Sequence, residues 1–283
     1  MNKHSRVTVR ALQAMKNAGE KITMLATYDY FTAKVLDESG VDLLLVGDTL
    51  GMAFGGKETT LSVLLDHVVY HAEIVSRATN RAMVIGDMPF LTYQVNPDQA
   101  VVNAGRLMQE SHVHGVKLEG GRSMIPVVKR ILQAGIPVMG HLGLTPQSVH
   151  RFGGFLVQGK DAESAERMKQ AALALQEAGC FAIVLEAVPA DLADEVTKLL
   201  SIPTIGIGAG PSCDGQVLVA SDMLGLTGFK AKYLRPYADV GGTIRQAANS
   251  FVRDVKEGTF PSQEEIGKRR VGKECRSRWS PYH

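Results

Sequence analysis

Acidic and imidazole side chains recur along the chain at the ends of short apolar runs. The runs are followed by Asp48, Asp87, Glu119, His141 and Glu186. Short unbroken apolar runs are typical of parallel strands that are buried on both faces. The carboxyl ends of such strands are where α/β proteins place their chemistry. If the strands close into a barrel, these five side chains converge on one pocket.

Three of these residues, Asp48, Asp87 and Glu119, offer only carboxylate oxygens. Oxygen-only sites select hard cations that keep several waters, and magnesium is the favoured ion. An alternative is that each acid caps a helix or pairs with a lysine. Three neighbouring acids would repel one another and bind protons unless a cation were present, so the set favours a metal site.

Lys117 stands two residues before Glu119, so on a strand both side chains point to the same face, into the barrel mouth. A lysine there can pair with a substrate carboxylate or stabilise an enolate oxygen. The alternatives are the Schiff-base lysine of an aldolase and an internal salt bridge to Glu119.

His141 can act as an acid or base, or it can orient a carboxylate, and we favour the second role. Glu186 follows the apolar residues 183–185. Partial burial is expected to raise its pKa toward that of a useful general base.

The elements that must position these residues alternate as strands and helices, with the acid-bearing strand ends separated by lengths typical of single βα units. This pattern predicts an α/β fold, a (β/α)8 TIM barrel. The expected strands span residues 22–26, 41–46, 82–85, 115–118, 136–139, 182–185, 203–207 and 223–226.

Helix starts are marked by residues that cap helices. Thr8 is expected to cap a helix over residues 9–17, which would plug the bottom of the barrel, and a final helix is expected over residues 240–256. The other expected caps are Ser62, Asn96, Ser123 and Asp161.

Composition sets the class of protein. The chain has 283 residues, of which 45% are hydrophobic, enough for a sizeable core. No apolar run is long enough for a membrane span or a signal peptide, so a soluble cytoplasmic protein with no membrane partner is expected. Residues 268–278 carry a surplus of five positive charges, and without it the formal charge of +2 becomes −3. The rest of the chain therefore lacks the excess of positive charge that is typical of nucleic-acid-binding proteins. We expect one domain over residues 1–266 and a basic tail over residues 267–283.

Several motifs carry a resemblance to a known family. They are Val46-Gly47-Asp48-Thr49-Leu50-Gly51, Gly86-Asp87-Met88-Pro89-Phe90, Val116-Lys117-Leu118-Glu119-Gly120-Gly121, Gly140-His141-Leu142-Gly143-Leu144-Thr145-Pro146-Gln147 and Ile205-Gly206-Ile207-Gly208-Ala209-Gly210. Together, and in this order, they resemble the ketopantoate hydroxymethyltransferase (3-methyl-2-oxobutanoate hydroxymethyltransferase) family from about residue 5 to residue 261.

The resemblance implies a barrel of the phosphoenolpyruvate mutase and isocitrate lyase superfamily with an N-terminal capping helix, assembled as a homo-oligomer, typically a decamer. It also implies residue roles: Asp48 and Asp87 as magnesium ligands, Glu119 as a further metal-site carboxylate, Glu186 as proton acceptor, and Asp48, Thr49, Asp87 and Lys117 as ketoacid contacts. The family usually has serine where Thr49 stands, which keeps the hydroxyl and adds a methyl group. The basic segment after residue 266 also departs from the family pattern.

The implied reaction belongs to pantothenate (coenzyme A) biosynthesis. A hydroxymethyl group passes from 5,10-methylenetetrahydrofolate to 3-methyl-2-oxobutanoate through a magnesium-stabilised enolate, and the product is 2-dehydropantoate. One alternative is a carbon–carbon lyase of the same superfamily acting on a 2-oxo acid, although no Lys-Lys-Cys-Gly-His type segment is present. Another is a non-catalytic metabolite-binding barrel. Such a barrel would need neither a lysine nor several acids at one rim.

Overall fold

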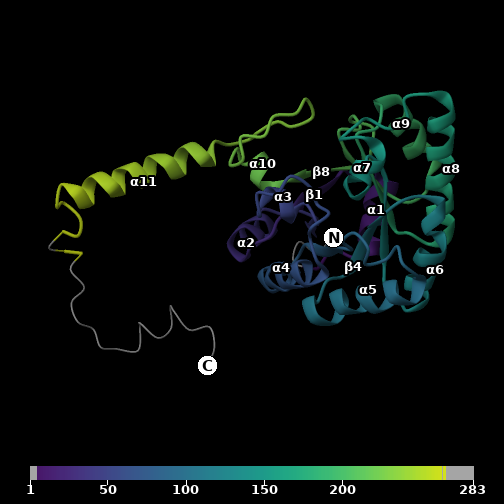
Figure 1. Cartoon of the computed structure of the whole chain (residues 1–283), viewed down its shortest axis with the longest axis horizontal. Coiled ribbons are helices and arrows are strands. Elements are labelled where there is room, and N and C mark those ends of the chain that lie inside the picture. Colours follow the sequence, from purple (N-terminus) through teal and green to yellow (C-terminus); the bar gives the residue numbers. More distant parts are fainter. Residues whose placement is uncertain (1–4, 263, 266–283) are drawn as a thin grey trace.

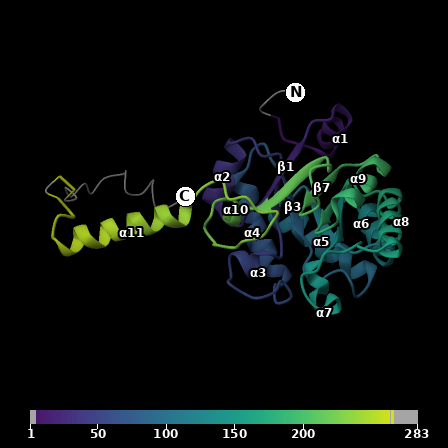
Figure 2. The same ribbon diagram turned by 90° about the horizontal axis from the view of Figure 1, so that it is seen from above.

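A computed structural model describes residues 5–262 and 264–265. Within them, eight parallel strands form a closed barrel in which each strand pairs with the next and β8 pairs with β1 (Figures 1 and 2). The (β/α)8 barrel predicted from the sequence is therefore confirmed. The strands are β1 (Ile22–Ala26), β2 (Leu43–Val46), β3 (Met83–Asp87), β4 (Gly115–Glu119), β5 (Val138–Gly143), β6 (Ala182–Glu186), β7 (Thr204–Ile207) and β8 (Gly215–Val219).

Helices surround the barrel, and consecutive ones pack side by side: α2 on α4, α4 on α5, α5 on α6, α6 on α8, and α8 on α9. Two short 3₁₀ helices, η1 (Arg122–Met124) and η2 (Pro146–Ser148), precede α6 and α7. The α-helices are α1 (Val9–Ala18), α2 (Tyr30–Glu38), α3 (Leu50–Ala53), α4 (Leu65–Ala78), α5 (Pro97–Ser111), α6 (Ile125–Gln133), α7 (Val149–Phe152), α8 (Ala162–Ala178), α9 (Ala190–Leu199), α10 (Ala220–Met223) and α11 (Val240–Lys256). None of the helices among the described residues is both long and apolar enough to cross a membrane.

The core follows from the apolar runs. Every residue of β2, β3 and β4 is buried, because the barrel interior covers one face of each strand and the helices cover the other. Burial on both faces explains why these strands show no alternation of polar and apolar residues.

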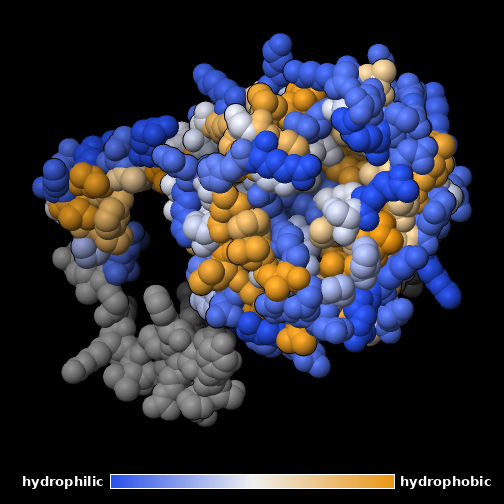
Figure 3. Space-filling model, turned by 45° about the vertical axis from the view of Figure 1, so that its right-hand side comes forward, coloured by the Kyte–Doolittle hydropathy of each residue, from blue (hydrophilic) through white to orange (hydrophobic). Residues whose placement is uncertain are grey.

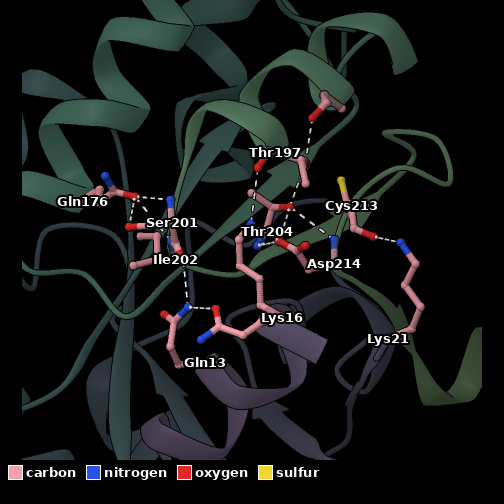
Figure 4. Close-up of polar contacts among 12 residues, drawn as sticks. Gln13, Lys16, Lys21, Gln176, Thr197, Ser201, Ile202, Thr204, Cys213 and Asp214 are labelled. Carbon is pink, nitrogen blue, oxygen red and sulfur yellow. Dashed lines mark hydrogen bonds and ion pairs between the residues drawn. The ribbon is translucent and has the colours of Figure 1, made fainter. Parts of the chain in front are cut away.

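The amino end of the barrel is closed by α1, as expected from the sequence. Thr8 caps this helix by accepting a hydrogen bond from the Ala11 N–H at 3.3 Å. Lys16 then pairs with Asp214, the residue before β8, at 2.7 Å, and Gln13 donates to the Ser201 carbonyl at 2.7 Å. Figure 4 shows these side chains reaching from α1 to the segments that lead into β7 and β8.

Three expectations about local structure are wrong. The last strand is β8 rather than residues 223–226, and Met223 ends the short helix α10 instead. Ser62 does not cap α4, which begins three residues later and has Leu64 at its N-cap position. Ser123 lies inside η1, so the cap position of α6 falls to Met124. The caps at Asn96 and Asp161 are confirmed, since each side chain accepts a backbone N–H of its helix.

The final helix, α11, projects away from the barrel (Figures 1 and 2). None of its residues is buried. Its exposed apolar residues include Ile244, Phe251, Val252 and Val255, a spacing that places them on one side of the helix. Figure 3 shows hydrophobic surface on the projecting part of the molecule, with hydrophilic surface above it. The expected tail, residues 267–283, lies outside the described residues, and the domain boundary at residue 266 stays a prediction.

Candidate active site

The predicted site residues lie together at the carboxyl end of the barrel. Strands β2 to β6 deliver them, because each apolar run ends at a polar residue on the same rim. The buried members are Asp48, Asp87, Lys117, Glu119 and His141. Glu186 keeps 21% of its side-chain surface exposed, in agreement with the partial burial expected for it.

Strand register decides which of these side chains meet. Asp87 on β3 is paired with Lys117 on β4, and Glu119 on β4 is paired with His141 on β5. The Lys117 Nζ accordingly lies 2.8 Å from Asp87 Oδ2. The alternative of a salt bridge from Lys117 to Glu119 is wrong, because Lys117 pairs with Asp87 on β3 and Glu119 lies beside His141 on β5. Burial lowers the pKa of Lys117, but the charges of Asp87, Glu119 and Asp48 outweigh it and keep the ammonium group protonated.

His141 lies between three charged groups. Its Nδ1 is 3.4 Å from Lys117 Nζ and 3.5 Å from Glu119 Oε1, and its Nε2 is 3.3 Å from Glu186 Oε2. Burial and the Lys117 charge lower the pKa of His141, whereas the carboxylates of Glu119 and Glu186 raise it, and the net result is a pKa of about 9. His141 therefore links the acid cluster to Glu186, which fits the orienting role that the sequence favoured.

The carboxylates carry an excess of negative charge. Burial raises the pKa of Asp48 well above its usual value, and the charges of Asp87 and Glu119 raise it further. Burial also raises the pKa of Asp87, although Lys117 opposes the shift. Within the part of the chain that the structure describes, Asp87 Oδ1 is buried without a hydrogen-bond partner. A cation with oxygen ligands would satisfy that atom and relieve the repulsion.

The acids do not form a closed ligand cage. Among residues 5–262 and 264–265, no three His, Cys, Asp or Glu side chains already surround one point as metal ligands would. Magnesium does not need such a cage, since it keeps several waters and usually binds proteins through one or two carboxylates and oxygens of the substrate. Asp48 and Asp87 fit that mode, with Glu119 as a nearby third carboxylate.

Thr49 follows Asp48 on the same rim and is half-buried. Its Oγ1 lies 2.7 Å from the hydroxyl of Tyr28, which comes from the loop after β1. Burial raises the pKa of Tyr28 above its usual value, so the phenol stays protonated and can donate. The sequence predicted Thr49 as a ketoacid contact but gave no role to Tyr28.

Two more residues of the site were missed from the sequence. Gln147, in η2, donates from Nε2 to Asp48 Oδ2 at 2.9 Å, and its backbone N–H donates to Glu119 Oε2 at 3.1 Å. Its Oε1 accepts a hydrogen bond from the Tyr93 hydroxyl at 2.7 Å. Both side chains are buried. The only signal for Gln147 was its place at the end of the motif that starts at Gly140, and Tyr93 gave none.

The backbone around Glu186 is tightly constrained. Gly143 has φ +93°, and a Cβ there would overlap the Glu186 carbonyl oxygen, which accepts the Leu144 N–H at 2.8 Å. Ala187 has φ +48°, a left-handed conformation that costs a non-glycine residue about 1–3 kcal/mol. Such strain occurs often at functional sites, and here it lies directly after Glu186.

A closed parallel barrel with acids, a lysine and a histidine at its carboxyl end defines the class of (β/α)8 barrel enzymes. The particular family follows from sequence. A model of the family described as ketopantoate hydroxymethyltransferase matches residues 6–263. The chain belongs to this family.

Curated relatives support the assignment over nearly their whole length. A protein of Syntrophus aciditrophicus (strain SB) named 3-methyl-2-oxobutanoate hydroxymethyltransferase is 52% identical over 264 residues, which cover 93% of this chain and 97% of the relative. A protein of the same name from Clostridium novyi (strain NT) is 53% identical over 258 residues, covering 91% and 94%.

Solved structures support the fold alone. A 2,3-dimethylmalate lyase, described as a PEP mutase/isocitrate lyase superfamily member, matches with a TM-score of 0.55 and 15% identity over 92% of each chain. A phosphonopyruvate hydrolase in complex with oxalate and Mg²⁺ matches with a TM-score of 0.57 and 14% identity over 94% of each chain.

Proposed function

We propose that the protein transfers a hydroxymethyl group from 5,10-methylenetetrahydrofolate to 3-methyl-2-oxobutanoate, giving 2-dehydropantoate in pantothenate biosynthesis. Family membership supports the activity. The observation that carries it in this chain is the line of groups from Asp87 through Lys117 and His141 to Glu186, which combines an anion-binding end with a carboxylate base.

Asp48 and Asp87 would hold the magnesium ion, with Glu119 as a further carboxylate of the metal site. The unpartnered Asp87 Oδ1 and the raised pKa values of both aspartates support this assignment. When bound, the ion supplies positive charge to the keto and carboxylate oxygens of the substrate.

Lys117 and Thr49 would contact the ketoacid, together with the two aspartates. The Lys117 ammonium is buried and held by Asp87, so it presents a fixed positive charge to an incoming carboxylate. Thr49 keeps the hydroxyl of the usual serine, and its bond to Tyr28 fixes the direction of that hydroxyl. The added methyl group narrows the space beside the substrate.

Glu186 would accept the C3 proton of 3-methyl-2-oxobutanoate. The electron pair left at C3 would form the new bond to the one-carbon unit, and the proton would remain on the Glu186 carboxylate. The bond between that carbon and the folate nitrogen would break, water would supply the hydroxyl oxygen, and tetrahydrofolate would leave. His141, 3.3 Å from Glu186 Oε2, orients this carboxylate toward the substrate. General bases of this kind contribute about 10²- to 10⁴-fold to rate.

One assay tests the proposal. The purified protein should form 2-dehydropantoate from 3-methyl-2-oxobutanoate only when methylenetetrahydrofolate is present. Excess chelator should abolish the activity, and magnesium should restore it. Folate-independent cleavage of a 2-oxo acid would indicate the carbon–carbon lyase instead, and full activity in excess chelator would remove the metal from the proposal.

The protein would act as a homo-oligomer in the cytoplasm, with a decamer as the expected size. The uncovered apolar side of α11, at Ile244, Phe251, Val252 and Val255, supports assembly, since apolar stripes of this kind are normally covered. Native mass measurement would test the size, and a monomer at micromolar concentration would contradict it.

A further inference from the structure

We propose that Gln147 and Tyr93 form a positioning pair that orients the carboxylates of the metal site. The inference rests on the proposed function, because it assigns these residues a role toward the magnesium ion. Neither residue would touch the reacting atoms. They would act through Asp48 and Glu119.

The first step of the argument is how Gln147 contacts the acids. Its side-chain amide reaches Asp48, which follows β2, and its backbone N–H reaches Glu119, which ends β4. Asp87 lies on β3, between these two strands in the barrel. One residue of the loop after β5 therefore holds the two acids on either side of Asp87.

The second step is the direction of the hydrogen bonds. The Glu119 N–H donates to the Tyr93 oxygen at 3.1 Å. The Tyr93 hydroxyl lies 2.7 Å from Gln147 Oε1 and 3.2 Å from the Glu119 carbonyl oxygen, so the shorter of its two contacts is with Gln147. Gln147 then has its Nε2 hydrogens for Asp48 Oδ2 and the Met88 carbonyl, both at 2.9 Å. Rotating the amide by half a turn would place Nε2 against the phenol and Oε1 against two acceptors. Tyr93 and the Gln94 amide, which donates to the same Oε1 at 3.0 Å, therefore fix which end of the Gln147 amide faces Asp48, and Tyr93 makes the shorter contact.

The third step is that Gln147 is uncharged. It donates a hydrogen bond to Asp48 without neutralising the carboxylate, whereas a lysine or arginine at this place would cancel the negative charge. A neutral donor fixes the side-chain rotamer while leaving the carboxylate its full charge for a cation. Groups that orient metal ligands in this way typically change metal affinity or activity by 10–100-fold when mutated.

The test uses Gln147→Met, which keeps the length of the side chain and removes both polar atoms. Titration calorimetry with Mg²⁺, or with Mn²⁺ as a probe, should show affinity weakened by about 10–100-fold. Activity lost at low magnesium should return at high magnesium, because mass action compensates for weaker binding. A role limited to stability would not produce this rescue.

The chain offers a matched control at the other end of the barrel. Gln176 accepts hydrogen bonds from the Ser201 N–H at 2.7 Å and from the Ile202 N–H at 3.3 Å, in the segment that leads into β7 (Figure 4). Gln176→Met should lower the melting temperature and leave metal affinity at the parental value. Tyr93→Phe removes only the hydroxyl and should weaken metal binding in the same direction as Gln147→Met.

The outcomes separate this inference from the proposed function. If the parental protein binds no divalent ion or makes no 2-dehydropantoate, the proposed function fails. If the parental protein does both and Tyr93→Phe and Gln147→Met bind metal with parental affinity, the positioning pair is wrong. Should Gln147→Met not fold, Tyr93→Phe decides alone, since Phe fills the same buried space.

Discussion

The carboxylates at the two ends of the barrel differ in whether basic side chains balance their charge. At the amino end, Asp214 pairs with Lys16 at 2.7 Å, and Asp42 pairs with Arg81 at 2.8 Å. At the carboxyl end, Asp48, Asp87 and Glu119 have only Lys117 and His141 as basic neighbours, His141 also contacts Glu186, and the pKa values of both aspartates are raised. The amino end has its charges balanced, while the carboxyl end keeps an excess of negative charge.

The difference shows where stability and chemistry are separated in this fold. Ion pairs and α1 close the amino end, where none of the predicted site residues lies. The carboxyl end carries repulsion between carboxylates, which a positively charged ligand would relieve, and a strained backbone at Ala187. Both destabilise the free protein. Changes at the two ends should therefore differ in what they affect.

The largest effect is expected from Glu186→Gln at the carboxyl end. The amide keeps the size of the side chain but cannot accept the C3 proton, so deuterium uptake into 3-methyl-2-oxobutanoate should slow by about 10²- to 10⁴-fold. Proton NMR in heavy water with magnesium and without folate measures this exchange. The melting temperature should stay near the parental value, since Glu186 is partly exposed.

An exchange rate equal to that of the parental protein would remove Glu186 as the base and direct attention to His141. A large fall in the melting temperature of Glu186→Gln would contradict the contrast between the two ends, because it would mean that Glu186 at the carboxyl end also stabilises the fold.

The same contrast explains what the sequence could predict. The rim residues on β2 to β6 were predicted because each strand is a continuous apolar run that ends at a polar side chain. Strand β8 was missed because Gln216 is exposed and Leu218 is only half-buried. The apolar run that predicts a strand depends on burial of both faces, and the outer face of β8 lacks that cover.

The positions of Gln147 and Tyr93 could not be predicted for a different reason. They are 54 residues apart in the chain, and their contact depends on the paths of two loops. Strand register follows from regular geometry, whereas loop paths do not. The predicted helix caps at Ser62 and Ser123 were wrong for a related reason, because residue type alone does not show at which residue a helix begins.

The next largest effect should come from Asp214→Asn at the amino end. The change removes the charge that faces Lys16 and keeps the shape of a group that also accepts the Thr204 N–H at 2.8 Å. Hydrogen bonds to charged groups contribute about 1.5–3 kcal/mol, so unfolding in urea should show a loss of about 2 kcal/mol. Turnover measured on the folded protein should not change.

Asp194→Asn is the matched control for that loss. Asp194 pairs with Lys198 at 2.6 Å, but this pair is on the surface, where ion pairs contribute about 0–1 kcal/mol. Equal losses in the two variants would show that the closed amino end has no special role in stability.

A smaller effect of opposite sign is expected for Asp48→Asn. Removing one charge relieves repulsion with Asp87 and Glu119, and the amide oxygen can still accept from Gln147. The metal-free protein should gain roughly 0.5–2 kcal/mol in stability, as happens at active sites that trade stability for function. Added magnesium should raise the melting temperature of the parental protein and not that of the variant. A less stable variant would show that the acid cluster is not repulsive.

The smallest effect concerns His114, which lies next to the amino end of β4. Burial and the Arg6 charge lower the pKa of His114 below its usual 6.5. The unfolded chain then binds more protons than the folded protein in this range, so stability rises with pH. The contribution is fully present above about pH 6.5 and is lost as the pH falls through the lower folded pKa.

Protonation would also break the hydrogen bond that His114 Nδ1 accepts from the Val84 N–H at 3.1 Å. His114→Asn can keep an acceptor near that N–H and cannot take up a proton, so its melting temperature should fall less than that of the parental protein between about pH 8 and about pH 5. His150→Asn changes an exposed histidine and should keep the parental slope. If His114→Asn and the parental protein show the same slope, the acid sensitivity comes from other groups, and the amino end is less strictly balanced in charge than its ion pairs indicate.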